Sequence, residues 1–276
     1  MKNWKYIVLC SFLCSAFFSS CMKQQQDILH VQSVDYVWLT ELEAETPDEG
    51  AINNWIHNAV STGLTNDCYV SERNGNLIVS NLCMNQQAYT MPGDNGYFVG
   101  VDMGEFDSWV MFFPYYSAIM PELVREPEMV VNEHCLGFVK VDNTRGYLFT
   151  RKEADHSAYL EHPNIGLVYE LQFPTGKSNW ECTKIADLEG FKFQFVYDKV
   201  SSLIYIATNK SLLSFSTVDN SVVELADLSL WESIGCSSIV QLNGKLYLSM
   251  HMGIYEYDLS KSDWKWYPIP SEKYVS

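Results

Sequence analysis

Three carboxylates lie close together in the segment GVDMGEFD, at Asp102, Glu105 and Asp107. Paired carboxylates can divide acid and base roles when their surroundings separate their pKa values, as in enzymes that cleave glycosidic bonds. The same residues also suit a polar turn between two strands, in which Asp102 binds its own backbone beside Gly104. The segment is therefore a candidate catalytic site, with a structural turn as the alternative.

A second candidate is the segment RKEADHSAYLEHPN, residues 151–164, which interrupts an otherwise strand-like pattern. Loops inserted into a regular scaffold often carry binding function. We therefore assign possible ligand or partner contacts to Arg151, Asp155, His156 and His162, with a plain surface loop as the alternative. Histidines beside acids can hold a divalent metal, but this spacing matches no compact metal motif, so we predict no metal and no cofactor.

A third candidate is aromatic. Trp109, Tyr115 and Tyr116 lie in SWVMFFPYYS and can form a stacking surface for sugar rings or a partner protein. Packing inside the fold is the alternative. The chain lacks the motifs H-E-x-x-H, G-x-S-x-G and the P-loop, so no familiar catalytic signature favours an enzyme over a binding protein.

The elements that must position these residues repeat along the chain. The stretch NGKLYLSMHMGIYEYDLSKSDWKWYPIP, residues 243–270, contains three alternating β-rich runs separated by turns. Ile204 and Leu246 are 42 residues apart, and intervals of 42 also separate Trp180, Val222 and Trp264. A period in the low forties with four strands per unit is typical of a β-propeller. We predict an all-β propeller of about five four-stranded antiparallel blades, with six as the alternative.

The rest of the chain fits this plan with two exceptions. The N-terminal strand, residues 34–40, is expected to join a terminal blade, because a radial arrangement of sheets still needs its edges covered. Residues 51–60 suit a short helix or an irregular loop. Matching Leu148 to Ile204 leaves fourteen extra residues, about the length of the inserted segment. Trp180, Trp264 and Trp266 fall on repeat positions, which favours packing within or between blades.

The first residues are typical of an export signal. Lys2 and Lys5 precede an apolar run of about a dozen residues, shorter than the about 20 needed to span a membrane. Small residues then precede Cys21, as in a bacterial lipoprotein signal whose cysteine is acylated. We expect a signal peptide at residues 1–20, a lipid-anchored tether at 21–27 and the propeller at 28–276. An ordinary secretory signal is the alternative.

The net charge bears on the class of binding partner, and the cysteine count bears on disulfide bonding. The net charge is −16, and since residues 1–20 contribute two lysines and no acid, the remainder is near −18. So acidic a surface repels phosphate backbones, which argues against nucleic-acid binding. Five cysteines remain after Cys21, and their odd number leaves at least one thiol unpaired. We expect mainly buried single thiols; the alternative is one disulfide, most locally between Cys68 and Cys83.

Segments of the sequence also resemble known proteins. GLTNDCYVSERNGNLIVSN is similar to a repeat of two-component-regulator propellers, and the whole chain resembles uncharacterised exported bacterial β-propeller proteins that share a segment like NGYFVGVDMGEF. This resemblance implies a propeller and no particular activity. We therefore expect a binding module for a protein or glycan, anchored by lipid in a bacterial cell envelope. The alternative is an exported carbohydrate hydrolase or lyase that uses the carboxylate cluster.

Overall fold

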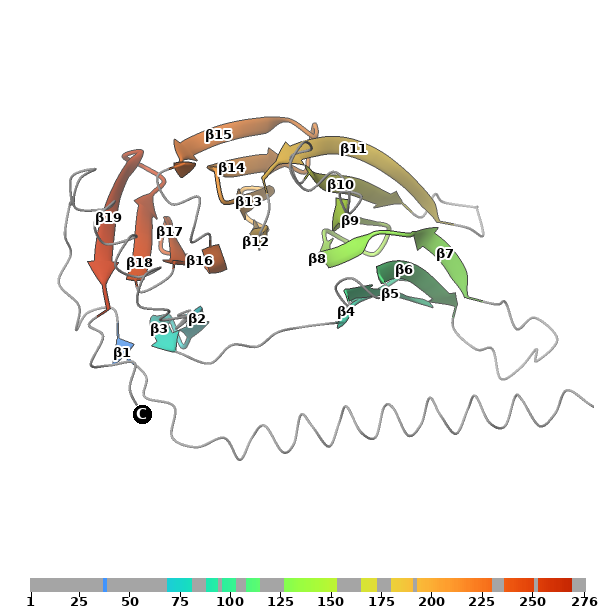
Figure 1. Ribbon diagram of the computed structural model, residues 1–276, viewed down its shortest axis with the longest axis horizontal. Helices are drawn as coiled ribbons and strands as arrows, with labels where there is room; N and C mark the ends of the chain where they lie inside the picture. The colour runs from blue at the N-terminus through green and yellow to red at the C-terminus, as the bar shows by residue number, and fades with distance from the viewer. Residues whose placement is uncertain are drawn as a thin grey trace, which may run out of the picture. The chain divides into compact units, whose positions relative to one another are not determined.

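The computed structural model describes eleven stretches of the chain, all within one compact unit, Val37–Ser276. They are residues 37–38, 69–80, 88–93, 96–102, 108–114, 127–152, 165–172, 180–190, 193–229, 236–250 and 253–269. These stretches form strands and turns without an α-helix (Figure 1). No helix among them is long and apolar enough to cross a membrane.

The strands form five antiparallel sheets. The first sheet has three strands, β1 (Val37–Trp38), β2 (Tyr69–Arg73) and β3 (Asn76–Ser80). The second has β4 (Ala88–Pro92), β5 (Gly96–Asp102), β6 (Ser108–Pro114) and β7 (Glu128–Val131). The third has β8 (His134–Lys140), β9 (Arg145–Lys152), β10 (Ile165–Gln172) and β11 (Glu181–Glu189). The fourth has β12 (Gln194–Asp198), β13 (Leu203–Ala207), β14 (Ser211–Ser216) and β15 (Val222–Asp227). The fifth has β16 (Cys236–Leu242), β17 (Lys245–Met250), β18 (Gly253–Asp258) and β19 (Asp263–Pro268).

The four later sheets are simple meanders, because their strands pair in the order in which they occur along the chain. Their first strands contact first strands of other sheets, β4 with β8 and β12 with β16, and β16 also contacts β2. Their last strands are the most exposed, with β11 and β15 mainly open to solvent. First strands inside and last strands outside is the arrangement of a propeller blade, so the fold is all-β and propeller-like.

Apolar clusters join successive sheets. Phe98 of the second sheet packs with Leu148 of the third, Phe149 of the third with Ile204 of the fourth, and Leu212 of the fourth with Leu246 of the fifth. The fifth sheet then packs against the first, through Ile254 and Val79 among others. The N-terminal strand β1 pairs with β3, and therefore completes the first sheet.

The predicted repeat is confirmed in its buried positions. Ile204 and Leu246 are both fully buried in the second strands of their sheets. The proposed match of Leu148 to Ile204 is wrong by two residues. The second strands align from their first residues as RGYLFT, LIYIAT and KLYLSM, which places Leu148 opposite Ile206 and gives all three strands a tyrosine at the third position. The sequence comparison failed because apolar residues fill several consecutive places in these buried strands.

Two Asn-Gly turns and two tryptophans agree with the repeat pattern. Asn74-Gly75 and Asn243-Gly244 have positive φ angles of 55° and 78°, and 52° and 75°, as a two-residue hairpin turn of type I′ requires. Trp180 packs edge-on against Phe98 with ring centroids 4.6 Å apart, which confirms packing between sheets. Trp266 is buried. The helix considered for residues 51–60 and the lipidation site Cys21 lie outside the described residues.

Candidate functional site

Of the three acids in the carboxylate segment, Asp102 lies within the described residues. Asp102 is the last residue of β5 and pairs with Ser108, the first residue of β6, so the two flank the connection 103–107. The other predicted site residues lie outside the described stretches, namely Glu105, Asp107, Tyr115, Tyr116, Asp155, His156 and His162. The site is therefore built here from the strand residues that hold these connections.

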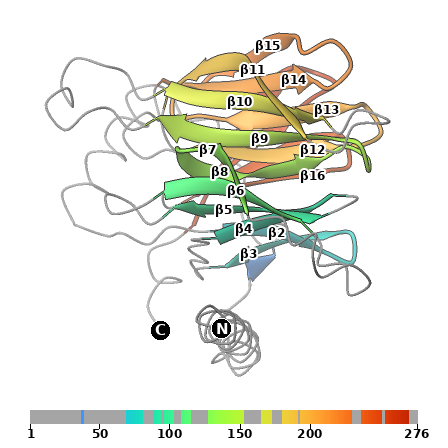
Figure 2. The same cartoon turned by 90° about the vertical axis from the view of Figure 1, so that its right-hand side faces the viewer.

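Arg151 was expected in the inserted loop, and this is wrong. It lies in β9, where it pairs with His134 of β8 and Gly166 of β10, because the strand continues to Lys152. A guanidinium nitrogen of Arg151 is 3.9 Å from Oδ2 of Asp102. Two candidates that were distant in sequence thus meet at the junction of the second and third sheets. β8 contacts both β5 and β6 there, and Figure 2 shows β8 next to β6.

His134 completes this junction, and its side chain is buried. Its Nδ1 atom is 2.9 Å from Oδ1 of Asp102 and 2.8 Å from Oγ of Ser108. We call Asp102, Ser108, His134 and Arg151 the His134 cluster. The cluster lies where the β5–β6 connection meets the open end of the β8–β9 hairpin. Its polar contacts therefore join the second and third sheets.

The cluster contains a serine, a histidine and an aspartate, but its geometry is not that of a hydrolase triad. In a triad the aspartate binds one ring nitrogen and the serine binds the other, so that the ring can take the serine proton. Here Ser108 and Asp102 contact the same nitrogen. Ser108, His134 and Asp102 therefore do not form a triad among themselves.

Close approach of the two sheets makes the cluster possible. A Cβ atom added at Gly100 would lie 2.1 Å from Sγ of Cys135, so glycine is needed for the strands to come this near. Burial raises the pKa of the Cys135 thiol to about 12, so the nucleophilic thiolate is scarce at neutral pH. Cys135 is a packing residue between sheets, as expected from the sequence for a single buried thiol.

A second set of polar contacts lies beside the cluster. Glu133 accepts hydrogen bonds from the hydroxyls of Tyr169, at 2.9 Å, and Thr150. Burial, with the bond to Glu133, raises the pKa of Tyr169 far above its usual value. Partial desolvation and the charge of Glu133 raise the pKa of the Cys182 thiol to about 11, although the residue as a whole is exposed. The described cysteines are Cys135 and Cys236, which are buried, and Cys182, which is exposed; no disulfide joins any two of them.

Trp109 is not part of the His134 cluster. It follows Ser108 in β6, and neighbouring strand residues point to opposite faces of a sheet. Trp109 is half-buried opposite Val101. Of the predicted acids and aromatics, Asp102 and Trp109 are described, and they lie on opposite faces of the second sheet.

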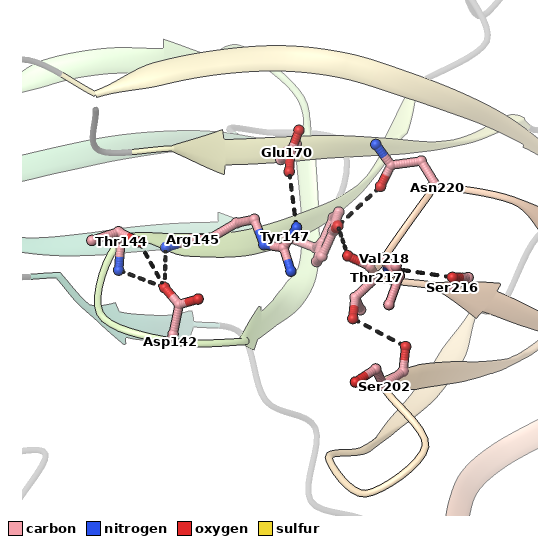
Figure 3. A network of polar contacts seen from close by, with 10 residues as sticks. All are labelled: Asp142, Thr144, Arg145, Tyr147, Glu170, Ser202, Ser216, Thr217, Val218 and Asn220. Carbon is pink, nitrogen blue, oxygen red and sulfur yellow. Dashed lines mark hydrogen bonds and ion pairs between the residues drawn. The ribbon is translucent and has the colours of Figure 1, made fainter. Parts of the chain in front are cut away.

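A further polar network ties the third sheet to the fourth at the other end of β9 (Figure 3). The Tyr147 hydroxyl lies 3.3 Å from the carbonyl oxygen of Thr217 and 2.9 Å from Oδ1 of Asn220, the two acceptors within its reach. Thr217 in turn donates to the carbonyl oxygen of Ser202. Arg145, the first residue of β9, is 3.8 Å from Glu170. Both ends of β9 thus carry an arginine–carboxylate pair.

His134 and Ser108 are site residues that were not predicted from the sequence. The partners of His134 come from another hairpin. Nothing in the spacing of Asp102 and His134 signals their contact, because it depends on how two sheets pack. Within the described stretches, no group of three or more His, Cys, Asp or Glu side chains is placed to hold a metal ion.

Comparisons with known proteins add little. No family model matches the sequence, and no curated protein matches it either. Among solved structures it is similar to a chain of the "Crystal structure of Nidogen/Laminin Complex". That similarity has a TM-score of 0.33 and 9% sequence identity, and covers 73% of this chain and 89% of the other. The fold assignment rests on the sheets described above.

Proposed function

We propose that this chain is a five-bladed propeller that binds a protein or glycan partner at the face marked by the His134 cluster. The observation that carries the proposal is the contact between Arg151 and Asp102. Asp102 begins the connection 103–107 and Arg151 lies one residue before the end of β9, where residues 153–164 begin. The two segments with the most candidate binding residues are therefore attached side by side.

The chemistry of the cluster supports binding over turnover. The Asp102 carboxylate contacts Nδ1 of His134 and forms an ion pair with Arg151. Ser108 contacts the same nitrogen of His134. A firmly held junction is a suitable base for two binding segments, since a rigid base lowers the entropy lost on binding. An exported hydrolase using Glu105 and Asp107 is the alternative.

The test uses two arginines of the same strand. Arg151 and Arg145 are about equally exposed, at 34% and 31%, and each faces one carboxylate at similar distance. A photo-crosslinking residue at the exposed Lys152 should capture a partner in cells, and the same residue at Lys265 should not. Arg151→Ala should lower capture by about tenfold, equivalent to about 1.4 kcal/mol, whereas Arg145→Ala should leave it unchanged.

For a glycan partner, the readout is a thermal-shift screen with envelope oligosaccharides. A ligand at 100 times its dissociation constant adds about 2.7 kcal/mol of stability, a shift of a few degrees. If neither capture at Lys152 nor a shift that depends on Arg151 is seen, the proposed face is wrong. Release of a sugar product that stops in Glu105→Gln or Asp107→Asn would favour the hydrolase.

The proposal includes attachment to a bacterial membrane through a lipid on Cys21, which places the module in the cell envelope. Its support is the signal-like sequence that precedes Cys21. Cells grown with a clickable fatty acid should label the chain, and Cys21→Ser should abolish the label. Label that persists in Cys21→Ser, or no label in the native chain, would refute the lipid anchor.

A further inference from the structure

Exposed valines gather on one sheet. Six large apolar side chains of the described residues are exposed, and four of these are valines of the fourth sheet. Val200 is 96% exposed, Val218 77%, Val223 55% and Val222 40%. We call these four the valine corner. Val200 lies in the turn after β12, Val218 in the turn after β14, and the other two begin β15.

The two turns that carry these valines are linked. The backbone nitrogen and the hydroxyl of Thr217 both donate to the carbonyl oxygen of Ser202, each at 3.0 Å. Figure 3 shows this contact beside Val218, with Tyr147 of the neighbouring sheet bonded to Thr217. This contact joins the two turns, whereas Val222 and Val223 lie on opposite faces of β15 because they are neighbours in the strand.

Polar side chains of the two turns hold the backbone around these valines. Asp198 accepts from the backbone nitrogen of Val200 at 2.9 Å, and Ser216 accepts from that of Val218 at 3.3 Å. Asp219 accepts from the nitrogen and the hydroxyl of Ser221. A fixed backbone and β-branched side chains with few rotamers leave little entropy to lose on binding. The two turns that carry Val200 and Val218 are therefore fixed by local hydrogen bonds.

The outer strand of this sheet differs from those of its neighbours. Exposed edge strands commonly carry lysine, which discourages pairing with other chains. β11 carries Lys184 and β19 carries Lys265, whereas β15, with the sequence VVELAD, carries none. Its charged residues are Glu224 and Asp227, and Asp198 and Asp219 lie on the adjoining turns. Lys199 is the cation on those turns.

We propose that the valine corner and the outer edge of β15 bind an extended protein segment in which aliphatic and cationic side chains alternate. Such a segment can add to an edge strand through its backbone, while alternate side chains meet the surface. The aliphatic side chains would cover Val223 on one face of β15 and the valines of the turns, and the cationic ones would face Glu224 on the other face. This surface is separate from the His134 cluster, at the opposite end of β9.

The test measures fluorescence anisotropy of a labelled peptide of alternating valine and lysine with the full chain. Binding should weaken at least about tenfold in the double variant Val218→Thr/Val223→Thr, which keeps β-branched side chains at exposed positions. Met129→Thr, at an exposed apolar residue of β7, is the matched control and should bind as the native chain does. Arg151→Ala should also bind normally, so this result is independent of the proposed face.

Three outcomes would overturn the proposal. The first is no binding of the valine–lysine peptide to the native chain. The second is equal binding of a serine–lysine peptide, which would mean that the lysine charges alone account for binding. The third is self-association of the native chain, seen by sedimentation and lost in the double variant, which would assign the corner to a second copy.

Discussion

Tyr147 shows how one buried hydroxyl can join two sheets. Its ring is fully buried and packs against Phe215 of the next sheet, with centroids 5.1 Å apart. Its hydroxyl has acceptors in Thr217 and Asn220 of that same sheet. Burial raises the pKa of Tyr147 to about 12, so the neutral phenol is retained well into alkaline solution.

Tyr147→Phe should therefore lower the free energy of unfolding by about 1 to 3 kcal/mol, since it removes the hydrogen bond and leaves a polar partner behind. The loss should be seen in urea denaturation at neutral pH. The contribution of the native hydroxyl is fully present below the unfolded pKa of 10 and disappears as the pH rises through about 12. A variant as stable as the native chain would show that the hydroxyl adds nothing net.

Glycine positions give a second prediction about single residues. A Cβ atom at Gly253 would lie 2.1 Å from the ring of Trp266 in the neighbouring strand. Gly253→Ala should cost about 1 to 3 kcal/mol, measured by urea denaturation, because the buried ring has little room to move. In the background of Trp266→Leu the same change should cost less, so the double-mutant cycle should show coupling. Equal costs in both backgrounds would contradict the predicted clash.

Hairpin turns are the recurring feature among the elements. Several contain aspartate followed two residues later by serine or threonine, and the carboxylate accepts from the backbone nitrogen of that second residue. These are Asp142-Asn-Thr144, Asp219-Asn-Ser221 and Asp258-Leu-Ser260. Such turns fix the hairpins locally, without help from the rest of the fold.

These turns predict loss of stability in acid. Hydrogen bonds from Ser260 outweigh desolvation and, with Lys261, lower the pKa of Asp258 to about 2, and similar bonds lower the pKa values of Asp142 and Asp219. Groups with lowered pKa values stabilise the fold above their unfolded pKa, near 3.8. That stabilisation is lost as the pH falls toward 2.

The measurement is the urea midpoint as a function of pH. The native midpoint should fall between about pH 4 and pH 2, and Asp258→Asn should flatten part of that fall, because asparagine accepts the same bonds without titrating. Asp187→Asn, at an exposed carboxylate that forms an ion pair with Lys184, serves as a comparison. Identical profiles for native chain and Asp258→Asn would refute a role for this turn.

Features of this local kind were predictable from sequence, and features between sheets were not. The Asn-Gly hairpins and the order of strands from residue 193 onward follow from turn residues and alternation. The His134 cluster does not, since its members come from β5, β6, β8 and β9 and meet only when two sheets pack. The assignment of Arg151 to a loop failed for a related reason. RKEADH is polar apart from Ala154, and polarity alone does not show at which residue a strand ends.

For the whole molecule, the contact between the first and fifth sheets is the one that links the most distant parts of the chain. Ile254 and Val79 belong to the same buried cluster. Ser238 of β16 accepts from the backbone nitrogen of Val70 at 2.8 Å and also bonds Ser249. The first sheet, with three strands, thus depends on the fifth for much of its burial.

Ile254→Ala should lower the free energy of unfolding by about 2 to 5 kcal/mol, as expected for a fully buried isoleucine. Hydrogen exchange should show the largest loss of protection in β2 and β3. The matched change Ile204→Ala, between the third and fourth sheets, should be as costly but should leave the relative protection of β2 and β3 unchanged. If both variants lost hydrogen-exchange protection equally in all sheets, the first sheet would not open separately from the rest.

The contact between the first and fifth sheets also determines when the first sheet can complete its folding during synthesis. β2 and β3 are made early, yet the surface that buries Val70, Leu77 and Val79 is made from residues 240–269. While the intervening sheets are being synthesised, these apolar strands have no final partner, and the long span to be closed slows folding. A nascent chain halted before β17 should therefore remain a client of a chaperone until its last hairpins are complete.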